Sequence, residues 1–86
     1  MEQGYTDNLT VPANSYLEQT ITFAESFSAS NAYSATTTLL SGRTDTTGLG
    51  YVSAIVRTRA ASSMVIRVVN DSSSSQVCRV IWLAIE

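Results

Sequence analysis

Residues 76–86 are dense in β-branched and aromatic side chains and contain neither Gly nor Pro, a pattern that predicts a β-strand. Alternate positions place Val77, Arg79, Ile81, Leu83 and Ile85 on one face and Cys78, Val80, Trp82 and Ala84 on the other. Both faces are mostly apolar, whereas a half-buried strand alternates between apolar and polar residues. We therefore predict a central strand with one face in its own core and the other against a neighbouring protomer. The apolar run is too short to cross a membrane, because a spanning helix needs about 20 residues.

Five further segments have the alternation or the composition of strands, namely residues 1–10, 17–23, 33–41, 51–58 and 64–69. The clearest is 17–23, in which apolar and polar side chains alternate throughout. The first segment alternates weakly, and we expect a short edge strand in which Gly4 lets another backbone approach closely. Six strands at short spacing, without a helical period, predict a small all-β sandwich.

Turn and loop signals separate these strands. Pro12, the only proline, precedes a turn, and longer polar loops are expected at residues 42–50 and 70–75. Residues 25–31 are also loop-like, with Phe27 as an apolar plug beneath them. One turn of helix is the alternative for this segment.

Composition narrows the ways in which so small a chain can be stabilised. Its 86 residues make a single domain, 1–86, near the lower limit for folding on one core. Domains of this size often need a disulfide, a metal or oligomerisation. With Cys78 as the only cysteine and no histidine, an internal disulfide is impossible and a zinc site lacks its usual ligands. We therefore expect no metal and no cofactor, and we expect oligomerisation.

The charged residues argue against two classes of function. The net charge is −2, with no lysine, whereas nucleic-acid binders gather basic residues on one face. Without histidine or lysine, a Ser or Cys nucleophile lacks its usual general base, so we do not expect an enzyme. The only Gly-rich turn, at residues 48–50, precedes a predicted strand and not the helix that a phosphate-binding loop requires.

Arginine is the charged residue that recurs inside the predicted strands, at Arg57, Arg59, Arg67 and Arg79. Each can belong to a solvated face or an ion pair. Alternatively, the flat fork of donors on arginine suits recognition of sugar hydroxyls or carboxylates. Trp82 likewise has two interpretations, a core residue or, less consistent with its apolar neighbours, a platform for sugar stacking.

Several short motifs resemble those of the H-type lectin fold. They are Ile21-Thr22-Phe23, a following Phe27, Tyr33-Ser34-Ala35 opening a strand, and the closing run Val80-Ile81-Trp82-Leu83-Ala84-Ile85. That family includes snail agglutinins and discoidin C-terminal domains, and a similar outline occurs at the C-terminal tips of bacteriophage tail fibres. The phage form is the more similar, because its loops are rich in Ser and Thr and its last strand ends in Trp-Leu-Ala-Ile. The resemblance spans residue 2 to the end of the chain.

This resemblance implies a six-stranded antiparallel sandwich that assembles as a trimer. It also implies a sugar site at the protomer boundary, whose residues by position are Gly4, Asp7 and Arg57. The lectins complete the site with aromatic or histidine side chains in the loop before the last strand, and residues 70–76 contain none. The lectins' preference for N-acetylgalactosamine is therefore not transferred. Asn70 and Asp71 occupy that loop and can supply hydrogen bonds instead.

We expect a homotrimeric receptor-binding domain at the tip of a phage tail fibre that attaches to a cell-surface glycan, with no nucleic-acid partner and no membrane insertion. One alternative is a structural cap that trimerises the end of a fibre without binding a ligand. Another is a free-standing lectin, which would be secreted and not part of a virion.

Overall fold

The computed structural model describes residues 1–41 and 51–86 of the chain. These residues form seven strands and no helix: β1 (Glu2–Tyr5), β2 (Leu9–Val11), β3 (Ser15–Thr22), β4 (Ser34–Ser41), β5 (Val52–Arg59), β6 (Ser63–Asn70) and β7 (Gln76–Ile85). The loop expected at residues 42–50 lies outside the described residues. Within the described ranges, no helix is long and apolar enough to cross a membrane.

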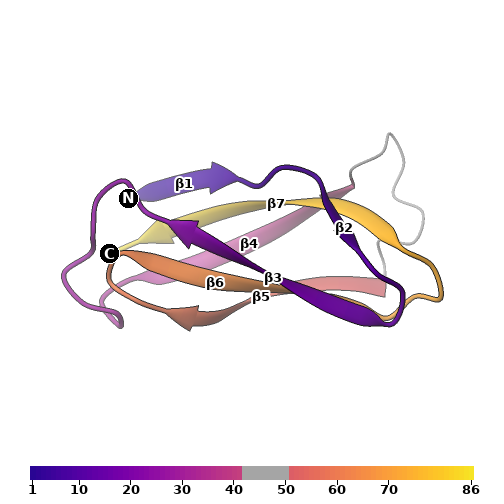
Figure 1. Ribbon diagram of the computed structural model, residues 1–86. Coiled ribbons are helices and arrows are strands. Elements are labelled where there is room, and N and C mark those ends of the chain that lie inside the picture. The colour runs from indigo at the N-terminus through magenta and orange to yellow at the C-terminus, as the bar shows by residue number, and fades with distance from the viewer. Residues whose placement is uncertain (42–50) are drawn as a thin grey trace.

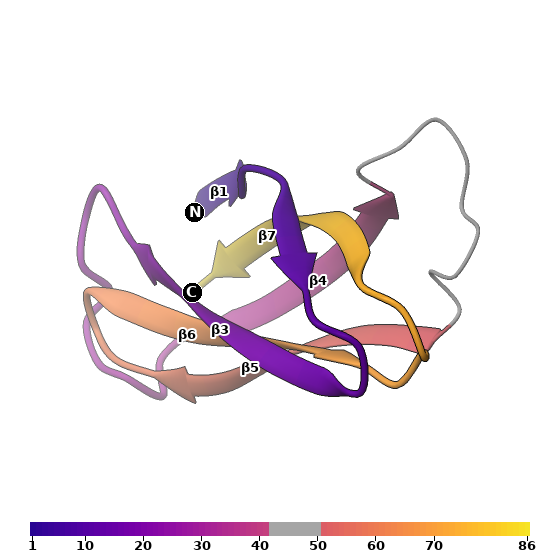
Figure 2. The same ribbon diagram turned by 45° about the vertical axis from the view of Figure 1, so that its right-hand side comes forward.

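The strands pair into two antiparallel sheets that pack face to face (Figure 1). In the first, here the β7 sheet, β1 and β2 pair with β7 along one edge and β4 pairs with it along the other. In the second, here the β6 sheet, β6 lies between β3 and β5. Figure 2 shows β4 lying above β5, and the Thr37 hydroxyl donates to the Ala54 carbonyl (3.2 Å) where these edges meet. The predictions of an all-β fold and of antiparallel pairing are confirmed.

The first ten residues form two strands, β1 and β2, and not the single edge strand that the sequence predicts. Both pair with β7, but the chain advances four positions from Tyr5 to Leu9 while β7 advances three, from Ile81 to Cys78. The extra residue comes after Thr6, because Thr6 still faces Val80: its amide donates to the Val80 carbonyl (2.9 Å) and its side-chain oxygen accepts from the Val80 amide (3.0 Å). Asp7 and Asn8 together therefore face Arg79 alone. An added residue of this kind interrupts the ladder as a β-bulge does. The described residues therefore have seven strands where six were expected.

The other strand predictions agree with the structure to within one or two residues at each end. The turn after Pro12 has a specific cause, because Asn14 has a φ of 51°. Asparagine tolerates this left-handed conformation better than other residues with a side chain, apart from aspartate. The Asn14 amide donates to the Ser72 carbonyl (3.0 Å), so the turn before β3 is tied to the loop before β7.

The core lies between the two sheets, and the alternation along β7 determines which of its side chains enter it. Cys78, Val80, Trp82 and Ala84 point inward and are buried, while the alternate set from Val77 to Ile85 points outward. The β6 strand supplies the facing layer, in which Met64, Ile66 and Val68 are at most 1% exposed. The prediction that one face of the last strand is in the core is confirmed.

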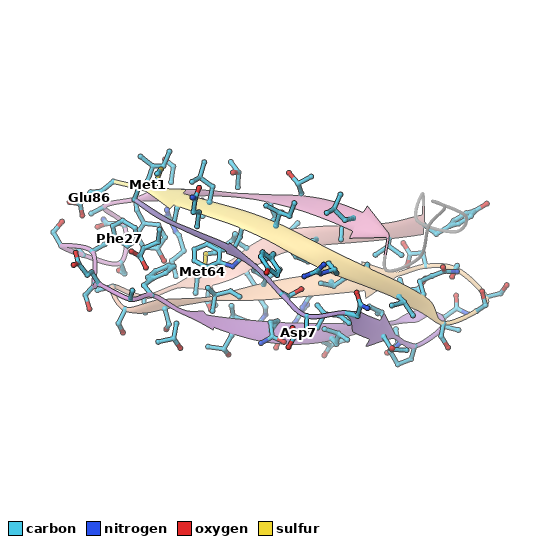
Figure 3. The ribbon with its side chains drawn as sticks, turned by 90° about the horizontal axis from the view of Figure 1, so that it is seen from above. Met1, Asp7, Phe27, Met64 and Glu86 are labelled. Atoms are coloured by element: carbon cyan, nitrogen blue, oxygen red, sulfur yellow. The ribbon has the colours of Figure 1, made fainter. Side chains whose placement is uncertain are left out.

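An aromatic cluster closes one end of the core. Phe27 lies in the segment between β3 and β4, which is a loop and not a turn of helix. Its ring stacks on Tyr33 (centroids 4.4 Å apart) and meets Phe23 edge to face (5.1 Å), as expected for a plug. The Tyr33 hydroxyl donates to the Ala60 carbonyl (3.1 Å), and burial raises the pKa of this phenol. Figure 3 shows Phe27 at this end of the sandwich, with Met64 further along the interior.

Candidate functional site

The outer faces of the two sheets differ in chemistry. On the β7 sheet the outward side chains are almost all uncharged: Gln3, Tyr5, Thr10, Ser34, Thr36, Thr38, Leu40, Val77, Ile81, Leu83 and Ile85. Arg79 is the one charged outward side chain among the described residues of this sheet. Several of the large apolar ones remain open to solvent, with Tyr5 68%, Ile85 47% and Ile81 41% exposed.

A shallow groove of about 590 Å³ lies on this face. Its lining consists of Gln3, Gly4, Tyr5, Thr36, Thr38, Ile81, Trp82 and Leu83. Two rows across the sheet form most of it, because Tyr5 and Thr38 flank Ile81, and Gln3 and Thr36 flank Leu83. The groove therefore presents aliphatic and aromatic surface with hydroxyl and amide groups at its sides, and no charge.

The single charged side chain on the described part of this face, Arg79, contacts neighbouring residues of the same sheet edge. The Arg79 guanidinium lies over the Tyr5 ring, 4.5 Å from its centroid, and its Nε donates to the Thr6 carbonyl (3.2 Å). A cation over an aromatic ring is attracted by the negative face of that ring. Arg79 thus supports Tyr5 and the bulged edge between β1 and β2.

The outer face of the β6 sheet carries a cluster of charge. Two guanidiniums converge on one carboxylate: the Nε atoms of Arg57 and Arg67 each lie 3.1 Å from Oε2 of Glu18. Arg67 also lies over the ring of Tyr16, 4.4 Å from the centroid. These groups come from all three strands of the sheet, with Glu18 on β3, Arg67 on β6 and Arg57 on β5. We call them the Arg57–Glu18–Arg67 cluster.

The three residues that the resemblance carries over do not meet within one chain. Gly4 is in β1, and Asp7 follows it on the exposed connection to β2, at one edge of the β7 sheet (Figure 3). Arg57 is in β5, an edge strand of the other sheet, and pairs with Glu18. Because β5 lies beneath β4, Asp7 and Arg57 are at opposite edges of the sandwich.

The side chain of Asn70 is buried and hydrogen bonded entirely within the protein. It is fully buried, and its Nδ2 contacts the carbonyls of Val11 (3.0 Å), Pro12 (3.2 Å) and Ser74 (3.0 Å). Its Oδ1 accepts from the amide (2.9 Å) and the hydroxyl (2.7 Å) of Ser72. An asparagine amide has two donor hydrogens and an acceptor with two lone pairs, so this side chain has no capacity left for a ligand.

Asp71 differs from its neighbour in exposure. Its side chain is exposed, and its backbone amide donates to the Tyr51 carbonyl (2.9 Å). Of the two loop residues that the sequence suggested as hydrogen-bonding partners for a ligand, Asp71 alone is accessible. It lies at the end of the sandwich that carries the β6–β7 loop, whereas Arg57 lies near the other end of β5.

The sequence interpretation missed the partners of Arg57. Glu18 occurs in the polar set of a predicted strand, and Arg67 was recognised as a strand arginine, but neither was connected to Arg57. The connection depends on the strand order β3-β6-β5 and on the pairing of Glu18 with Arg67. The alternation assigned each of these side chains to one face of its own strand, but no local signal indicated that the three strands are neighbours.

Acidic residues also gather where the two termini meet the loop after β3. Glu2 accepts the amide of Ala24 (2.7 Å), and Glu86 accepts both the amide (2.9 Å) and the hydroxyl (2.7 Å) of Ser28. These hydrogen bonds favour the charged form and lower the pKa of Glu86. Both carboxylates thus hold the loop in place. Within the described ranges, no three His, Cys, Asp or Glu side chains are grouped so as to hold a metal ion.

Comparison of the chain with protein-family models, curated proteins and solved structures gives no match.

Proposed function

We propose that this domain is a homotrimeric receptor-binding module, of the kind found at the tips of phage tail fibres, that attaches to a cell-surface glycan. The observation that carries the proposal is the contrast between the two outer faces. One face is almost uncharged and has an apolar line along its central strand, which suits association between copies. The other carries paired arginines with exposed aromatic and aliphatic neighbours, which suits a polar ligand.

The outer face of the β7 sheet supports the assembly. Ile81, Leu83 and Ile85 form a continuous apolar line along the central strand, flanked by the hydroxyls of β4 and the aromatic ring of Tyr5. Complete burial of a fully exposed aliphatic side chain contributes about 1.5–3 kcal/mol. Ile81 and Ile85 are 41% and 47% exposed, so each would gain roughly half of this on association, and the gain from all copies offsets part of its cost. In a trimer, each copy turns this line toward the three-fold axis.

Such an arrangement directs the β6 sheets outward. Each copy then displays one Arg57–Glu18–Arg67 cluster on the surface of the particle. Arginine next to a carboxylate provides both donors and acceptors, which is what neighbouring sugar hydroxyls require. Shallow sites of this kind are weak, with a dissociation constant of about 1 mM or roughly 4 kcal/mol per site. Three copies on one particle raise the effective affinity by avidity.

Two measurements test the proposal. Light scattering of the purified protein at micromolar concentration should give three times the mass of the chain, and a monomer would contradict the assembly. A glycan array probed with the trimer should show selective binding that Arg57→Ala weakens without dissociating the trimer. A trimer that binds no glycan would instead support a structural cap at the end of a fibre.

A further inference from the structure

We propose that the Arg57–Glu18–Arg67 cluster binds an anionic group, a carboxylate, sulfate or phosphate, carried on a sugar. The inference rests on the proposed glycan-binding function and specifies its ligand as an acidic glycan. It also extends the site from Arg57 to include Arg67 as a second donor and Tyr16 as a flanking ring.

The charge of the cluster is unbalanced. Two guanidiniums share one carboxylate oxygen, so the group carries a net charge of +1. The chain as a whole has a net charge of −2, which makes this face locally opposite in sign to the rest of the molecule. Two cations held close together repel one another, and a second anion beside them reduces that repulsion. A neutral sugar gives no such gain.

Both arginines retain donors that can reach a ligand. Arg67 hydrogen bonds to Glu18 through Nε, and Arg57 approaches the same oxygen through its own Nε. Among the described residues, no acceptor forms a hydrogen bond with the terminal nitrogens of either guanidinium. An arginine fork binds planar or tetrahedral oxyanions through two parallel hydrogen bonds. About half of the Arg57 side chain and a third of the Arg67 side chain are exposed, so these donors are accessible (48% and 30%).

The backbone and the aromatic neighbour hold the two arginines in position. The pairing of β5 with β6 shifts between Val56 and Thr58, so that Arg57 occupies a β-bulge. A bulge changes the direction of its side chain relative to the regular strand, and here the shifted residue reaches across the sheet to Glu18. Arg67 is held from the other side by the ring of Tyr16 at 4.4 Å. Side chains held in advance lose less entropy on binding.

Apolar surface beside the cluster explains why the anion should be part of a larger molecule. Ile55 pairs with Arg67 on the same face and is 56% exposed, and Tyr16 is 52% exposed. Together they flank the cationic group with an aliphatic and an aromatic surface. A sugar ring has an apolar face that can pack on such groups while its acidic substituent meets the arginines, whereas a free inorganic anion cannot use them.

The test is a titration of the trimer with matched sugars and anions, at low and at high salt. Amide chemical shifts monitor the binding. The probes are sialyllactose, sulfated lactose and lactose phosphate, with neutral lactose and inorganic phosphate as controls. Shifts should centre on β3, β5 and β6 around the cluster for the acidic sugars and be absent there for lactose. Binding should weaken as salt rises, because exposed charges are screened. The three acidic probes distinguish which oxyanion is preferred.

Variants separate ligand binding from a purely structural ion pair. Arg57→Gln and Arg67→Gln should each weaken binding of the acidic sugar about tenfold, and Arg57→Lys should weaken it too, because it retains the charge but not the fork. Glu18→Gln removes the competing carboxylate and should strengthen binding. Asn31→Asp, in the exposed loop between β3 and β4, makes the same change in net charge away from both outer faces and should leave binding unchanged.

Several results would overturn the inference. One is weaker binding of the acidic sugar by the Glu18→Gln variant. Another is that neutral lactose changes the amide chemical shifts around the cluster as much as the acidic sugars do. A third is that inorganic phosphate binds and no acidic sugar does. Failure of the acidic-glycan inference can be distinguished from failure of the proposed glycan-binding function. A trimer that binds only neutral glycans, on another surface, retains the function and refutes the acidic site. Absence of binding to every glycan refutes both.

Discussion

Gly4 lies directly opposite Trp82 in the β1–β7 pair, and a methyl group added to it would come 3.0 Å from Cζ2 of the indole. The two other near contacts, with Cε2 and Nε1 of the same ring, are 3.1 and 3.2 Å. Trp82 is buried against Phe23, with ring centroids 5.8 Å apart, so the indole has little room to move away. Packing against the indole is thus a reason for glycine at position 4 that does not involve a ligand.

Gly4→Ala should therefore destabilise the domain by about 1–3 kcal/mol through overpacking. Urea denaturation measures the change, and Trp82→Phe provides the matched background. In the Trp82→Phe protein, whose ring is smaller, Gly4→Ala should destabilise the domain less. The double-mutant cycle should therefore show coupling between positions 4 and 82. If Gly4→Ala kept full stability but lost glycan binding, the ligand-contact role implied by the lectin resemblance would be supported instead.

Asn70→Ala should lower the free energy of unfolding by roughly 3 kcal/mol, because it leaves buried carbonyls and an amide without partners. The side chain joins the β2–β3 turn at Val11 and Pro12 to the β6–β7 loop at Ser74, so both should loosen together. Chemical denaturation gives the energy, and amide hydrogen exchange reports the two loops. Asp71→Asn, at the exposed neighbouring position, serves as the control and should change stability by less than about 0.5 kcal/mol.

Leu83→Asp should convert the proposed trimer to a folded monomer. In an isolated copy Leu83 points outward and is half-buried, so an aspartate there is tolerated, whereas in the proposed trimer it would be an unpaired buried charge. Light scattering measures the mass, and circular dichroism checks the fold. Thr22→Asp, on the exposed outer face of the β6 sheet, should leave the trimer intact. A Leu83→Asp protein that stayed trimeric would place the interface elsewhere.

Cys78 should be unreactive in the folded protein. It is fully buried, and burial raises the pKa of its thiol, so the reactive thiolate forms only above the ordinary range near pH 8.5. A thiol reagent at pH 8 should modify the denatured chain rapidly and the native chain slowly. Because the folded-state pKa is the higher one, the contribution of this thiol to stability is complete below about pH 8.5 and is lost as pH rises through the folded-state pKa. The Cys78→Val variant should not lose this part of its stability as pH rises. If the stability of both proteins fell equally with pH, groups other than the thiol would be the cause.

The pattern of the sequence determined the strands and the direction of their side chains. A strand alternates with a period of two, so the inward set of residues 76–86 could be identified without knowledge of any partner strand. The same local signals identified the turn after Pro12 and the plug at Phe27. Both depend on neighbouring residues in the chain or on one large apolar side chain that has to be buried.

Tertiary structure alone decided which strands are neighbours and in what register. The extra residue between Thr6 and Leu9, which divides the first strand, arises from the pairing with β7, in which Thr6 and Val80 are 74 positions apart in the chain. The cluster around Glu18 likewise needs β6 between β3 and β5 and a shift of register at Arg57. Such pairings depend on packing across the whole sandwich, because an outward-facing side chain is compatible with any neighbouring strand. The separation of Asp7 from Arg57 has the same origin, since sheet membership is a property of the fold and not of either segment.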